Sequence, residues 1–125
     1  ITAFDLHQNK SSAVFNYKKK ELLRETIEWL GNESLPVFVN DHPNVFCICN
    51  NSVSDKYLIV TAINLSSDEA DSLSIDVPAG WENAFVFQLQ SKGNWSPLSA
   101  KRSGRTITFS AALKLMEPVV LKVKL

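Results

Sequence analysis

The chain has 125 residues, of which 45% are hydrophobic and 21% charged, a size and composition typical of one folded domain with a short appendage. Its 13 basic and 13 acidic side chains cancel, which argues against a partner such as nucleic acid or an anionic membrane. No apolar run approaches the roughly 20 residues that a transmembrane helix needs, so we expect no membrane partner.

The first 34 residues differ in pattern from the rest of the chain. The chain opens at Ile1 without methionine or a signal-peptide pattern, so we expect a fragment or a processed chain. Residues 1–6 and 13–15 are short apolar pieces separated by a polar loop. Residues 1–34 are therefore predicted to be the tail of, or a linker from, a preceding domain.

An amphipathic helix is predicted over residues 17–30. Its apolar stripe recurs every three or four positions and contains Leu22, Leu23, Ile27, Trp29 and Leu30. Asn16 is a candidate N-cap and Gly31 a candidate C′ residue, and Pro36 lies beyond the point where the helix ends. The stripe predicts that this helix packs on the following domain.

After Pro36 the period changes from helical to alternating, which indicates β-strands. The eight candidate strands are residues 37–39, 45–49, 57–65, 73–77, 85–89, 95–100, 106–110 and 119–125. Such spacing predicts a mainly β fold for residues 35–125. We expect an antiparallel, immunoglobulin-like β-sandwich of about seven to eight strands with one N-terminal helix packed on it.

Two kinds of strand can be distinguished by their faces. Residues 73–77 and 121–125 alternate apolar with polar side chains and predict one wet face each. The run 57–65 is apolar on both sides, so we expect it to be central and covered on both faces. The helix is the expected second cover, over the side that carries Leu58 and Val60.

No catalytic or metal-binding constellation stands out. Cys47 and Cys49 are the only cysteines, and their spacing predicts two buried thiols on one face of a strand. A redox or nucleophilic role would need a base, and His42 is the only nearby histidine. The acidic turn at residues 66–71 could offer calcium ligands, but it lacks the spacing of an EF-hand, which favours a solvated turn. We therefore expect no catalytic residue, metal or cofactor.

Two tryptophans lie in predicted turns and could form a sugar-binding platform. Trp81 follows Pro78-Ala79-Gly80, and Trp95 follows Gly93-Asn94. Aromatic rings can stack on the faces of pyranose sugars, whereas packing at the edge of the core is the structural alternative. Trp29 lies on the helix stripe and is expected in the core.

The order of these features resembles the C-terminal region of beta-galactosidase-like glycoside hydrolases. The segments that carry this resemblance are residues 21–24 (ELLR), 27–31 (IEWLG), 35–39 (LPVFV), 43–45 (PNV) and 57–66 (YLIVTAINLS). In that family a helix ends the preceding domain and a β-sandwich tail follows. The catalytic acid and nucleophile belong to a TIM barrel far upstream, so no site residue is carried over.

The resemblance implies a non-catalytic accessory domain that stabilises or positions the catalytic part of a larger carbohydrate-active protein. Its partners would be other domains of the same polypeptide, and such a parent could be secreted or periplasmic. A carbohydrate-binding module that uses Trp81 and Trp95 is the alternative, and an independent enzyme is the third hypothesis. Fold alone does not separate these hypotheses, because sandwiches host many functions.

The missing catalytic constellation leads to a first prediction. The purified chain should hydrolyse chromogenic glycosides no faster than buffer, because no carboxylate pair is embedded in an aromatic setting. Release of the chromophore is the measurement. Turnover that follows the protein through successive purification steps would contradict the prediction.

Overall fold

The computed structural model describes residues 17–52 and 54–125. The predicted N-cap Asn16 and the apolar pieces at residues 1–6 and 13–15 lie outside the described residues. The chain divides into two compact units, Ile1–Ser34 and Leu35–Leu125, and each is described by itself. Packing of the helix on the sandwich therefore stays a prediction.

The first unit contains helix α2, Tyr17–Gly31. The helix includes Gly31, and the left-handed backbone at its C-terminal end is adopted by Asn32, with φ of 51°. The prediction of Gly31 as the C′ residue is therefore wrong by one position, because asparagine also tolerates this conformation. Trp29 is 79% exposed, and its predicted place in a core depends on packing of the helix on the sandwich, so it stays a prediction as well.

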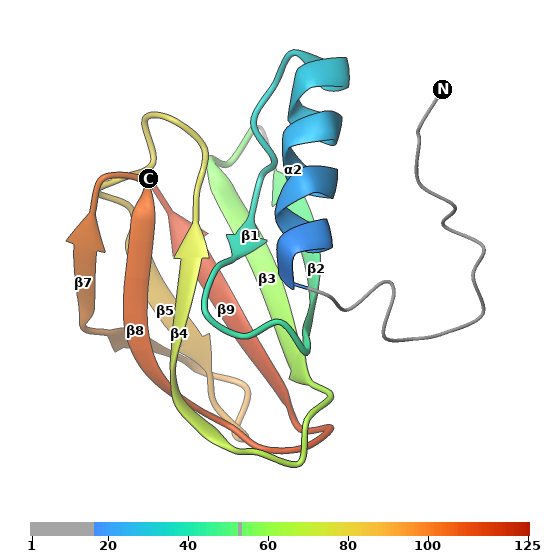
Figure 1. Ribbon diagram of the computed structural model, residues 1–125. Helices are drawn as coiled ribbons and strands as arrows, with labels where there is room; N and C mark the ends of the chain where they lie inside the picture. Colours follow the sequence, from blue (N-terminus) through green and yellow to red (C-terminus); the bar gives the residue numbers. More distant parts are fainter. Residues whose placement is uncertain (1–16, 53) are drawn as a thin grey trace. The chain divides into compact units, whose positions relative to one another are not determined.

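The second unit is a sandwich of two antiparallel sheets, which confirms the predicted fold class (Figure 1). Its described strands are β1 (Phe38–Val39), β2 (Val45–Ser52), β3 (Tyr57–Asn64), β4 (Ala70–Asp76), β5 (Phe85–Leu89), β6 (Trp95–Leu98), β7 (Ala100–Ser103), β8 (Thr106–Leu113) and β9 (Pro118–Lys124). One sheet has the order β1-β4-β8-β7, and the other has the order β2-β3-β9-β5-β6. Neighbouring strands in both sheets are antiparallel.

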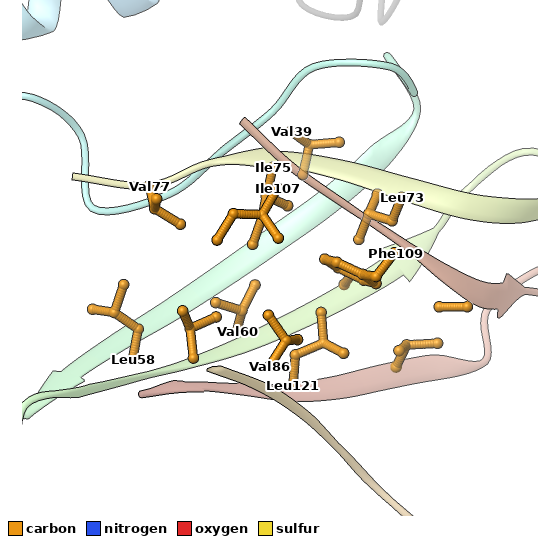
Figure 2. Close-up of a cluster of buried hydrophobic side chains, with 14 of the residues drawn as sticks. Val39, Leu58, Val60, Leu73, Ile75, Val77, Val86, Ile107, Phe109 and Leu121 are labelled. Carbon is orange, nitrogen blue, oxygen red and sulfur yellow. The ribbon is translucent and has the colours of Figure 1, made fainter. Parts of the chain in front are cut away.

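The core lies between the two sheets, where alternate side chains of each sheet point toward the other (Figure 2). Leu58 and Val60 of β3 and Leu121 of β9 come from the five-stranded sheet and are fully buried. Ile75 of β4 and Phe109 of β8 come from the four-stranded sheet. The side of β3 that was expected to need the helix as a cover is thus covered by the opposite sheet.

The predicted run 95–100 is two strands rather than one. Strand β6 pairs with β5 in the five-stranded sheet, and β7 pairs with β8 in the four-stranded sheet. The chain crosses between the two sheets at Ser99. Strands β6 and β7 are each the edge strand of their sheet. The turn after β7 contains Gly104, whose φ of 56° lies in the left-handed region that favours glycine.

The burial of Phe109 gives a prediction with a matched control. Phe109 is 2% exposed, whereas Phe85 on β5 is 67% exposed. Phe109→Ala should lower the free energy of unfolding by about 3–5 kcal/mol, because it leaves a cavity between the sheets. Phe85→Ala should lower it by less than about 1 kcal/mol. Urea denaturation of both variants measures the difference, and equal losses would show that the core is placed wrongly.

Candidate functional site

The cysteine pair is placed as the alternation predicts, on the core side of strand β2. Cys47 and Cys49 are half-buried and pack against the core, where they pair in register with Ala62 and Val60. Burial raises the pKa of the Cys49 thiol, which disfavours a nucleophilic thiolate. The His42 Nε2 atom lies 2.9 Å from the Ser72 carbonyl oxygen, so the ring contacts the backbone of β4.

The acidic turn is organised by a buried asparagine. The Asn64 Nδ2 group donates to the Asp68 and Leu113 carbonyl oxygens at 2.8 and 3.0 Å. Its Oδ1 atom accepts from the Ser66 backbone N–H at 2.9 Å. These bonds satisfy a polar side chain that is 3% exposed and hold the start of the turn against the end of β8.

Two open depressions lie at the surface of the sandwich. One, of about 290 Å³, is lined by residues that include His42, Asn64 and Glu69. The other, of about 610 Å³, lies where β5 ends and β9 begins and is lined in part by Gln88 and Glu117. Within residues 17–52 and 54–125, no group of three His, Cys, Asp or Glu side chains could hold a metal ion. No helix of the described residues is long and apolar enough to span a membrane.

The two candidate sugar-platform tryptophans lie at opposite ends of strand β5. Trp81 is half-buried against the core, in a turn where its carbonyl oxygen accepts from the Ala84 N–H just before β5 begins. Trp95 pairs with Leu89 at the other end of β5 and is 38% exposed. The structure therefore does not bring Trp81 and Trp95 into one platform, and sugar binding by either stays a prediction.

The outer face of the four-stranded sheet is polar. The outward positions of β4 and β8 carry Ser72, Ser74, Asp76, Thr106, Thr108 and Ser110, and of these Asp76 is buried. Ser74 and Thr108 hydroxyls lie 2.9 Å apart across the β4–β8 pair. The Thr106 hydroxyl donates to the Asp76 carboxylate at 2.7 Å. This face satisfies its own hydrogen-bonding groups and suits contact with water.

The outer face of the five-stranded sheet is apolar, in contrast. The side chains that alternate with the buried ones of this sheet form a surface that we call the apolar outer face. It includes Phe46, Ile48, Tyr57, Ile59, Ile63, Phe85, Phe87, Leu89, Trp95, Val120, Lys122 and Lys124, together with the polar residues Asn50 and Thr61. Phe46, Ile48, Phe85, Leu89 and Trp95 are exposed large hydrophobic residues. These exposed residues lie on β2, β5 and β6, on either side of the half-exposed outward residues of β3 and β9. Exposed apolar side chains that gather on one face are a feature of interaction surfaces in soluble proteins.

A lysine lies in the middle of the apolar outer face. Lys122 is on β9, where it pairs with Ile59 of β3 on one side and Phe87 of β5 on the other. Its Nζ atom lies 4.5 Å from the Tyr57 ring centroid and 5.8 Å from the Trp95 ring centroid. Both distances are within the range of a cation–π interaction. The two aromatic side chains thus lie around the one charged side chain that the described strands place at the centre of this face.

Sequence reasoning singled out Trp95 but missed Tyr57 and Lys122 as its neighbours. The three residues are far apart along the chain. Strand β9 lies next to the β3 strand of Tyr57, and the Lys122 ammonium also comes within 5.8 Å of the Trp95 ring on β6, beyond β5. The alternation of Lys122 with Leu121 and Val123 placed it on an outer face, which was the one available signal. Comparison of the chain with protein-family models, with curated proteins and with solved structures finds no match.

The environment of Cys49 gives a prediction about thiol reactivity. At pH 8 the raised pKa lowers the thiolate fraction, and the half-buried position restricts access. Iodoacetamide should therefore modify Cys49 at least about tenfold more slowly in the folded chain than in urea. Timed alkylation of a Cys47→Ser variant, followed by mass spectrometry, measures both rates. Equal rates in the two conditions would contradict this placement.

Proposed function

We propose that residues 35–125 form a non-catalytic accessory domain that docks onto another domain of the same polypeptide through the apolar outer face. The observation that supports this proposal is the difference between the two outer faces. One sheet carries hydrogen-bonded serine and threonine side chains outward, and the other carries exposed aromatic and aliphatic side chains. Such a one-sided apolar surface suits a permanent contact between domains.

The energetics favour covering this face. Complete burial of a Phe or Leu side chain stabilises by about 1.5–3 kcal/mol relative to exposure. Phe85 and Leu89 lie on one strand, and Trp95 pairs with Leu89 on the next. Aromatic residues that cluster in this way are the kind that dominate the binding energy of protein interfaces.

The nature of the larger protein is proposed from the sequence resemblance alone. A beta-galactosidase-like glycoside hydrolase would supply the catalytic carboxylates from another domain, and this domain would stabilise or position that part. A sugar-binding role for Trp95 is less well supported, because the Lys122 ammonium lies over its ring. Trp81 lies away from Trp95 and packs against the core.

The docking proposal is tested by binding between separated parts. The remainder of the polypeptide is expressed without this chain, and the 125-residue chain is titrated into it by calorimetry. Phe85→Asp combined with Leu89→Asp should weaken binding by at least about tenfold, because a buried unpaired carboxylate is costly. Unchanged affinity of this variant would overturn the proposal.

A matched control uses the polar outer face of the other sheet. Ser74 and Thr108 lie on neighbouring strands of that sheet, and their replacement by aspartate adds the same charge to the opposite side of the sandwich. The control variant should bind as the unaltered chain does. Urea denaturation of both double variants separates a loss of docking from a loss of folding.

A further inference from the structure

We infer that the surface that covers the apolar outer face presents a carboxylate to Lys122. The inference rests on the proposed docking function and names the chemistry of the partner surface, which is apolar with an acidic residue at its centre. Three observations carry it: the position of Lys122, the charge of the face, and the donors that the neighbouring rings leave unsatisfied.

Lys122 occupies a place that a docked surface would cover completely. It lies on β9, the central strand of the five-stranded sheet, and apolar Ile59 and Phe87 flank it in register. The lysine is half-buried before any partner is present. A docked apolar surface would therefore remove the ammonium from water, which costs several kcal/mol unless the charge is paired.

The face supplies no anion of its own. The outward positions of the five strands carry two cations, Lys122 and Lys124, and no carboxylate. In the part of the chain that the structure describes, no acidic side chain lies within ion-pair distance of the Lys122 ammonium. The five strands therefore offer no compensating negative charge, and we assign it to the surface that covers the face.

The same charge pattern argues against a second copy of this chain as the partner. Face-to-face packing of two copies would put four lysines and no outward carboxylate into one interface, and like charges in one interface are unfavourable. A different surface with an aspartate or glutamate satisfies the lysine.

The aromatic neighbours leave room for this carboxylate. The Tyr57 and Trp95 rings attract the ammonium through their electron-rich faces, but they replace only part of its hydration. An ammonium has three N–H donors, and a carboxylate can accept from those that do not point at the rings. A charge-assisted hydrogen bond of this kind is about twice as strong as a neutral one.

Carbodiimide cross-linking tests the inference directly. The reagent activates a carboxylate, the Lys122 Nζ atom attacks it, and an amide bond forms as the urea by-product leaves. The 125-residue chain and the remainder of the polypeptide are mixed, treated with carbodiimide, digested and analysed by mass spectrometry. We expect an amide between Lys122 and an aspartate or glutamate of the other part.

Two variants complete the test. Lys122→Met should weaken binding about tenfold and reduce its salt dependence, because the ion pair is lost while the apolar contact remains. Lys122→Arg keeps the charge but has no primary amine, so it should retain most of the binding and lose the cross-link.

The outcomes separate this inference from the docking proposal. Docking stands if the unaltered chain binds and the Phe85 and Leu89 double variant does not. The inference about Lys122 is nevertheless overturned if Lys122→Met binds like the unaltered chain and no cross-link forms at Lys122. If the unaltered chain does not bind the remainder of the polypeptide, the docking proposal falls and the inference falls with it.

Discussion

Burial of the alternating apolar side chains between the two sheets is the constraint on which the rest of the sandwich depends. Leu58, Leu121, Ile75 and Phe109 meet there from strands β3, β9, β4 and β8. Because side chains alternate with a period of two, a shift of the pairing register by one residue would move the apolar side chains of a strand from the core to the outer face. The core thereby determines strand register, and the register determines which residues share each outer face.

The core constrains only the inward-facing residues of each strand. The outward-facing residues that alternate with them are free to serve a function, and they differ between the two sheets. In the four-stranded sheet these residues are hydroxyl-bearing, and Ser74 and Thr108 satisfy one another. In the five-stranded sheet they are apolar, and Phe85 and Trp95 are exposed. The core needs neither set, since the inward residues alone fill the space between the sheets. The exposed apolar residues of the five-stranded sheet are therefore not explained by the core of the sandwich, whereas contact with another surface would explain them.

The fold class could be predicted from the sequence because the signal is local. Strands β4 and β9 alternate so regularly that both their existence and their inward faces follow from the residues. The boundary at Ser99 was missed because apolar residues on both sides make 95–100 read as one run. Pro97 was the available warning, since proline is confined to edge strands. The apolar run 57–65 was correctly read as a strand, but which of its sides faces the core depends on tertiary packing.

The candidate site was much less predictable than the fold. Trp95 could be singled out by its residue type, but its neighbours depend on the order of strands in a sheet. Tyr57 lies on β3, next to the strand β9 that carries Lys122, whereas Trp95 lies on β6, beyond β5. No spacing rule along the chain connects them. The sequence also suggested a joint role for Trp81 and Trp95, because both follow turn residues, whereas the structure separates them by the length of β5.

The lysine at the centre of the apolar outer face reconciles two opposing demands on this surface. An entirely apolar sheet face would promote non-specific association, and a central charge opposes it. The Lys122 stem covers apolar area while its ammonium stays near water, and the Tyr57 and Trp95 rings hold it in place. Once a partner covers the face, the same charge rejects every surface that lacks an acid at the matching position. Under the docking proposal, one residue thus limits self-association of the free face and selects the surface that can cover it.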